Sequence, residues 1–124
     1  HGQDLETLKI PPYTEVYEID GPYFFGIANK FDDISRRTHS DEQKVRIIRM
    51  RKVSFIDSTG IHNLEQLYMR LQRDGIQLVL SGVNEKVFNA LDKAGLVNKI
   101  GRENVRNHIN GALARAEEIV KSGD

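Results

Sequence analysis

Four consecutive residues, Asp57-Ser58-Thr59-Gly60, place a carboxylate and two hydroxyl groups where a strand gives way to a helix. The stretch before them, VRIIRM from Val45, is typical of a strand covered on both faces. The apolar residues after them recur at helical spacing, at Ile61, Leu64, Leu67, Tyr68 and Leu71. A helix N-terminus presents unpaired N–H groups and a positive dipole end, which both favour an anion. We therefore expect the functional site at this turn.

The two hydroxyl groups allow two interpretations. In the simpler one, the hydroxyl of Ser58 or Thr59 caps the helix, which contributes about 1 kcal/mol to stability. In the other, a hydroxyl is presented at the helix N-terminus and accepts a phosphate. That phosphate would add about two negative charges where the helix dipole tolerates them. The spacing alone leaves both interpretations open.

The sequence carries no signature of catalysis. His62 lies four residues after Ser58 on the same predicted helix, which does not bring nucleophile, base and carboxylate together as a triad requires. His39 and His108 lack metal-ligand spacing, and Ser81-Gly82-Val83 is a strand-end turn rather than a nucleotide loop. The absence of cysteine excludes thiol chemistry and disulfides. We expect no enzyme, no catalytic residue, no metal site and no cofactor.

Length and composition indicate one domain of 124 residues that is soluble as an isolated piece. No apolar run approaches the roughly twenty residues that span a bilayer. His1-Gly2 resembles the remnant of a cleaved tag, so we expect residues 1–9 to be tag remnant and linker, and residues 10–124 to be the domain.

The net charge is zero, which argues neither for nor against nucleic acid, and we expect no nucleic-acid partner. Five basic residues nevertheless form a strip around the central strand: Lys44, Arg46, Arg49, Arg51 and Lys52. We interpret this basic strip either as solvated strand ends and loops or as a docking surface for an acidic partner.

The elements before the central strand are predicted from alternation and turn signals. Residues 14–19 form a strand, Asp20-Gly21-Pro22 a turn, and Tyr23-Phe24-Phe25 a second strand that completes an antiparallel hairpin. Apolar residues at helical spacing predict a first helix over about 27–37.

The elements after the central helix follow the same pattern. Residues 76–80 form a buried strand, and Asn84 caps a helix that ends at Gly95. Residues 96–100 form a short apolar connection or a last edge strand. Asn104 caps a final helix whose apolar stripe comprises Val105, Ile109, Ala112, Leu113 and Ala116.

Single helices between strands require crossover connections, so the later strands should be parallel, whereas the opening hairpin is antiparallel. The predicted fold class is α/β, with a mixed, mainly parallel β-sheet packed with helices.

Two stretches of this chain resemble a known family. Phe55-Ile56-Asp57-Ser58-Thr59-Gly60-Ile61, between a strand and a helix, resembles the corresponding turn of STAS domains, which occur in sulfate transporters and anti-sigma-factor antagonists. The stretch VYEIDGPYFFGIANKF (16–31) is similar to the cytoplasmic C-terminal STAS domain of SulP-type anion transporters, whose human relatives are the solute carrier 26 proteins. The resemblance covers about residues 10–120 and implies the STAS (anti-sigma-factor-antagonist-like) fold.

The resemblance implies a regulatory and interaction domain at the cytoplasmic face of the bacterial inner membrane. It would serve a SulP-family secondary transporter of sulfate or another small anion, and support assembly, targeting or gating. The implied partners are the transmembrane domain of the same transporter chain and a cytoplasmic regulatory protein, and related domains suggest weak nucleotide binding. We expect a partner or anionic ligand to meet Asp20-Gly21-Pro22, Phe25-Gly26-Ile27 and Asp57-Ser58-Thr59-Gly60.

The other branch of the family implies a different function. In free anti-sigma-factor antagonists, a partner kinase phosphorylates the serine that follows the aspartate, and Ser58 matches that serine. Those antagonists carry a Gly-Glu-Leu-Asp type segment before their first helix, where this chain has YFFGIA at 23–28. We therefore favour the transporter branch, with a free-standing antagonist regulated by phosphorylation of Ser58 as the alternative.

Overall fold

The computed structural model describes residues 9–19 and 43–122. The predicted strand at Tyr23-Phe24-Phe25 and the predicted helix at 27–37 lie outside these residues. The described strands are β1 (Thr14–Glu18), β2 (Val45–Arg49) and β3 (Gln77–Ser81). The helices are α2 (Ser58–Arg73), α3 (Glu85–Lys93), α4 (Leu96–Ile100), the 3-10 helix η2 (Arg102–Asn104) and α5 (Ile109–Ser122).

The three described strands form a parallel sheet in the order β1-β2-β3. In the register of this sheet, Val45 on β2 lies opposite Thr14 on β1 and opposite Gln77 on β3. The predicted α/β class and the predicted parallel pairing of the later strands are therefore confirmed. The antiparallel strand that would make the sheet mixed falls outside the described residues.

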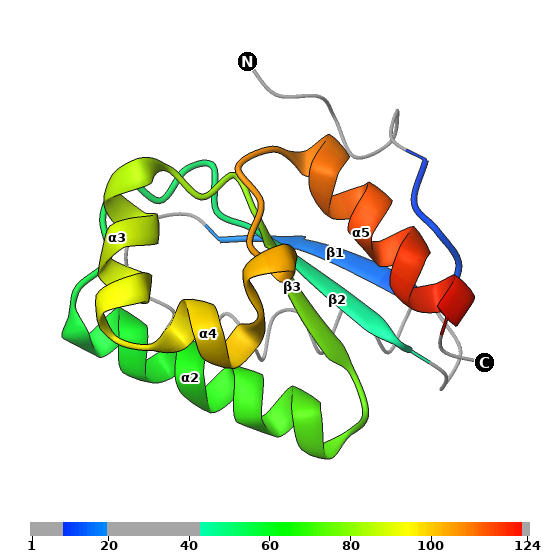
Figure 1. The fold of residues 1–124 in the computed structure, drawn as a ribbon, viewed down its shortest axis with the longest axis horizontal. Coiled ribbons are helices and arrows are strands. Elements are labelled where there is room, and N and C mark those ends of the chain that lie inside the picture. Colours follow the sequence, from blue (N-terminus) through cyan, green and yellow to red (C-terminus); the bar gives the residue numbers. More distant parts are fainter. Residues whose placement is uncertain (1–8, 20–42, 123–124) are drawn as a thin grey trace.

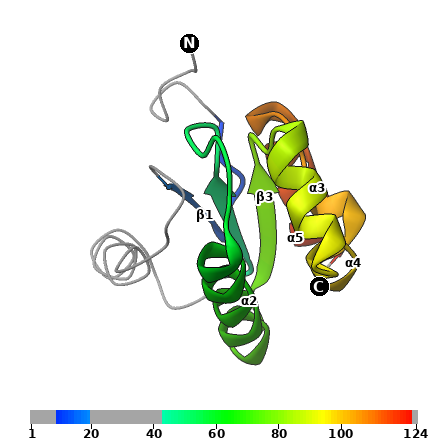
Figure 2. The same cartoon turned by 90° about the vertical axis from the view of Figure 1, so that its left-hand side faces the viewer.

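Helices cover both faces of the sheet (Figure 1). Along β2, Ile48 packs into the core shared with α2, α3 and α4, whereas Val45 and Ile47 pack against α5. This alternation is the period-two geometry of a strand, and every residue of β2 is buried, as predicted for a strand covered on both faces. Figure 2 shows α3 and α4 on the β3 side of the sheet, away from β1.

The prediction of an edge strand at 96–100 is wrong, because these residues form helix α4. Leu96, Val97 and Ile100 are buried, and their spacing fits one helix face. Gly95, at φ +82°, ends α3 and lets the chain turn directly into α4. The outer edge of β3 is instead met by Val105, which forms a parallel bridge with Leu80.

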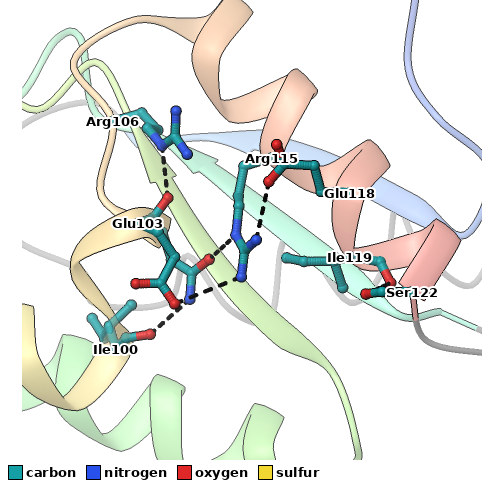
Figure 3. A network of polar contacts seen from close by, with 8 residues as sticks. Ile100, Glu103, Arg106, Arg115, Glu118, Ile119 and Ser122 are labelled. Atoms are coloured by element: carbon teal, nitrogen blue, oxygen red, sulfur yellow. Dashed lines mark hydrogen bonds and ion pairs between the residues drawn. The ribbon is translucent and has the colours of Figure 1, made fainter.

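The prediction that Asn104 caps the final helix is also wrong, because α5 begins only at Ile109. Asn104 is 1% exposed; its amide donates to the Ile100 carbonyl (2.8 Å) and its oxygen accepts from Arg115 Nε (2.7 Å). Figure 3 shows Arg115 reaching from α5 toward Glu103. Asn104 thus joins the end of α4 to α5, and Val105 is held at β3 instead of entering the α5 stripe. The other predicted members of that stripe do form it: Ile109, Ala112, Leu113 and Ala116.

Gly82 sits where the loop after β3 crosses the chain that follows β2. Its φ is +69°, and a Cβ there would lie 2.8 Å from the backbone nitrogen of Arg51. Gly75 provides a natural comparison, since its φ is +76° but a Cβ would meet nothing within 4 Å. The two glycines share the left-handed backbone and differ in whether another backbone approaches closely.

We predict that Gly75→Ala lowers the free energy of unfolding by about 1 kcal/mol, the cost of a left-handed backbone at a non-glycine residue. Gly82→Ala should lower it by a further ~1 kcal/mol or more, because the Arg51 backbone must also move. Urea unfolding of both variants measures the difference. Equal losses would mean that the close approach at Gly82 contributes nothing.

Candidate functional site

The carboxyl ends of the three parallel strands lie at one edge of the sheet, where open α/β sheets bind ligands. The strand ends are hydrogen bonded to one another. Ile19 N donates to the Arg49 carbonyl (3.0 Å), and Met50 N donates to the Ser81 carbonyl (2.7 Å). The loops that follow β2 and β3 therefore leave the sheet side by side.

The loop between β2 and α2 (residues 50–57) alternates anchors with exposed side chains. Val53 is 1% exposed and Ile56 8%, so both side chains hold the loop to the core. Ser54 and Phe55 between them are exposed, Phe55 by 43%. An exposed phenyl ring beside the motif is the feature that the sequence pattern missed, because apolar character alone predicts burial.

Asn84 connects this loop to α3. Its side-chain oxygen accepts from Val87 N at 2.7 Å, so it caps α3 as predicted. Its amide nitrogen lies 3.2 Å from the Val53 carbonyl oxygen and 3.3 Å from that of Ser54, and donates toward both. One side chain thus caps a helix and holds the neighbouring loop against it.

Helix α2 is capped by Asp57, whose carboxylate accepts from Gly60 N at 2.9 Å. The prediction that Ser58 or Thr59 supplies the cap is therefore wrong. The carboxylate belongs to the residue just before the first helical residue, which is the position that caps a helix N-terminus. Ser58 and Thr59 become the first two residues of the helix, and both are exposed.

The predicted site residues are thus described only in part. Asp57-Ser58-Thr59-Gly60 form the N-terminus of α2, with the two hydroxyl residues exposed and Gly60 buried. Asp20-Gly21-Pro22 and Phe25-Gly26-Ile27 lie outside the described residues, so their meeting with α2 stays a prediction. Ile19, just before the first of these stretches, lies at the same edge of the sheet.

The basic strip does not form one surface. Arg46 is held by Glu15 on β1, with Nη2 2.9 Å from Oε1, and both side chains are at most 10% exposed. Arg51 pairs with Glu18 instead, with 2.9 Å between Nε and Oε2. Glu15 thus engages Arg46 directly opposite it in the parallel register, and Glu18 engages Arg51 in the loop after β2. A role of the strip in docking an acidic partner stays a prediction.

The pKa of Glu18 lies below its ordinary value. Burial by itself would raise this pKa, but the hydrogen bond and the charge of Arg51, together with the charges of Lys52 and Arg49, outweigh it. A carboxyl whose pKa is lowered by folding stabilises the protein above its unfolded-state pKa. That contribution is lost as the pH falls through the folded-state pKa.

We predict that Arg51→Gln raises the pKa of Glu18, because the hydrogen bond and nearest charge are removed. Carboxyl carbon NMR titration measures this pKa directly, and Arg70→Gln on the exposed side of α2 serves as the control. A Glu18 pKa that is the same in both variants would contradict the assignment.

We predict that Asp57→Ala lowers the free energy of unfolding by about 1 kcal/mol, whereas Asp57→Asn, which keeps an acceptor, stays within about 0.5 kcal/mol of the parent. Ser58→Ala should also stay within about 0.5 kcal/mol, because Ser58 is exposed and does not cap. Thermal and urea unfolding measure all three, and a larger loss for Ser58→Ala than for Asp57→Ala would overturn the cap assignment.

Within residues 9–19 and 43–122, no group of three histidine, aspartate or glutamate residues is placed to hold a metal ion. In the same residues, no helix combines the length and apolarity needed to cross a membrane.

The fold and the motif place this chain among known proteins. The family model described as "STAS domain" matches residues 7–112. Sulfate transporter 1.2 of Arabidopsis thaliana is 33% identical over 114 residues, which cover 83% of this chain and 18% of the transporter. The chain thus spans about a fifth of the length of this curated relative.

Two solved structures from bacteria match nearly the whole chain. A sulfate transporter family protein from Wolinella succinogenes has a TM-score of 0.82 and 36% identity, covering 95% of this chain and 96% of that one. The STAS domain of a SulP transporter from Vibrio cholerae has a TM-score of 0.78 and 32% identity, covering 92% and 88%. The chain therefore belongs to the STAS domain family, and within it resembles the STAS domains of SulP-type sulfate transporters.

Proposed function

We propose that this chain is the regulatory and interaction domain of a bacterial SulP-type secondary anion transporter, with sulfate as the favoured substrate. Similarity to proteins named as sulfate transporters supports this proposal. The relative from Arabidopsis thaliana is about five times as long as this chain. A full-length protein of that size could also contain a transmembrane domain, which would be the first partner of this domain. The domain would lie at the cytoplasmic face of the inner membrane and act in assembly, targeting or gating.

The observation that carries an interaction role is the N-terminus of α2. Phe55, Ser58 and Thr59 are exposed there, above a loop that buried side chains and Asn84 hold in place. A partner that covers the exposed part of Phe55 gains on the order of 1 kcal/mol from its burial. The two hydroxyls supply hydrogen bonds that specify the partner, which would be the transmembrane domain or a cytoplasmic regulatory protein.

The second candidate is a free anti-sigma-factor antagonist, which the exposure of Ser58 favours. A phosphate on Ser58 would sit at the positive end of α2, whose first turn contains no acidic side chain. Incubation with candidate anti-sigma kinases, followed by mass spectrometry, tests this function. A phosphate on Ser58 supports the antagonist, and an unchanged mass counts against it.

We predict that Ser58→Glu in the full-length protein changes anion uptake, because it adds a negative charge to the proposed contact surface. The fold should survive, since an acidic residue in the first turn of a helix is favourable. Gln66→Glu is the matched control, because it adds the same charge to an exposed position about 12 Å farther along α2. Uptake is measured by radiolabelled sulfate, with membrane levels checked by immunoblot.

The control should transport like the parent. Normal uptake by Ser58→Glu at normal membrane levels would contradict the proposed role of this surface.

A further inference from the structure

A cavity of about 580 Å³ opens where the chain leaves β3. Residues 82–85, residues 105–107 and the side chains of Arg51 and Phe88 line it. The cavity forms between two segments, because the bridge between Val105 and Leu80 brings the segment before α5 beside the loop after β3. Ligand pockets for small organic molecules span roughly 300–1,000 Å³, so the cavity has the size of an organic molecule rather than of an inorganic ion.

One part of the cavity wall is apolar. Val83, Phe88 and Val105 contribute to the lining, and all three belong to or pack against the larger core cluster. The guanidinium of Arg102, which is not part of the lining, lies over the Phe88 ring, 5.6 Å from its centre. The wall therefore combines two branched aliphatic side chains with an aromatic ring, a surface suited to a flat apolar group.

The charge of the cavity is concentrated on Arg106. Arg51 is already paired with Glu18, whereas Arg106 uses only Nε, which donates to the Glu103 carbonyl at 2.6 Å (Figure 3). Among the described residues, none forms a hydrogen bond or ion pair with the two terminal nitrogens of Arg106, although Nη1 lies beside Gly111 of α5, 3.7 Å from where a Cβ would stand. Two hydrogen bonds hold the backbone of Arg106 in place, because its N–H donates to the Leu80 carbonyl and its own carbonyl accepts from the Val83 N–H.

Glu85 limits the charge that the cavity can accept. Its carboxylate belongs to the first turn of α3 and to the cavity lining, and it has no hydrogen bond or ion pair with another described residue. Because Arg106 and Glu85 both line the cavity and carry opposite charges, the cavity attracts a negative charge near Arg106 and repels one near Glu85.

We propose that this cavity binds a small organic monoanion with a flat apolar group. The acidic group of the ligand pairs with the terminal nitrogens of Arg106, and its flat part packs on Phe88, Val83 and Val105. A bidentate contact between guanidinium and carboxylate gives this orientation. The site goes beyond the proposed function and does not depend on it, because it is formed by residues other than the exposed ones at the N-terminus of α2.

The test uses 2-naphthoate as the probe, with inorganic sulfate and the uncharged 2-naphthalenemethanol for comparison. We expect 2-naphthoate to shift the backbone amide resonances of Gly82, Asn84, Val105 and Arg106 in a saturable way. Arg106→Gln should weaken this binding about tenfold or more, as loss of a charge-assisted contact does. Arg73→Gln, which removes an exposed guanidinium at the end of α2, away from the lining, should stay within about twofold of the parent.

Glu85→Gln is an independent test of the same site. Glu85 is exposed and has no hydrogen bond or ion pair with another described residue, so the substitution breaks neither. It should strengthen binding of 2-naphthoate severalfold and admit the dianion 2-naphthyl phosphate. The proposal is overturned by shifts that do not saturate or that lie elsewhere, or by equal affinity in Arg106→Gln and Arg73→Gln. Sulfate or the uncharged alcohol binding as tightly as 2-naphthoate would overturn it as well.

Discussion

The side chain of Asn84 connects the parts of this domain that carry its proposed functions. Its oxygen caps α3, and its amide nitrogen holds the carbonyls of Val53 and Ser54 in the neighbouring loop. That loop ends at Asp57, where α2 begins, and Asn84 itself lines the cavity beside Arg106. Parallel pairing makes this possible, because it brings the ends of β2 and β3 to one edge of the sheet.

The close approach at Gly82 serves the same arrangement. Because Gly82 has no Cβ, the loop after β3 passes directly over the backbone of Arg51. The loops after β2 and β3 are therefore in contact before α2 or α3 begins. The first loop presents Phe55 to solvent and leads into Ser58 at the start of α2, and the second leads into α3, whose Phe88 lines the cavity. The proposed partner surface and the proposed ligand site therefore share one framework while using different side chains.

Much of this framework could be predicted from local patterns. The apolar run from Val45 and the helical spacing from Ile61 predicted β2 and α2, and Asn84 was predicted as the cap of α3. Where two local signals were equally good, the sequence could not choose between them. Asp57 and Ser58 are comparable capping residues, and three apolar residues at 96–100 fit a strand or a helix.

Other features depend on contacts between distant residues. Asn104 was predicted as a cap, but it is buried between α4 and Arg115 once Val105 joins the edge of β3. The pairing of the basic strip with β1 requires the parallel register of β1 and β2. No pattern in the sequence relates Phe88 to Arg106, so the cavity between them emerges only from the fold.

The central claim is that this chain works as one domain of a membrane transporter. An immunoblot of fractionated native cells, with an antibody raised against the domain, tests this claim most directly. The account predicts a band in the membrane fraction at roughly five times the 14.2 kDa of the present chain. A soluble band near 14.2 kDa would contradict it and would point to the free antagonist.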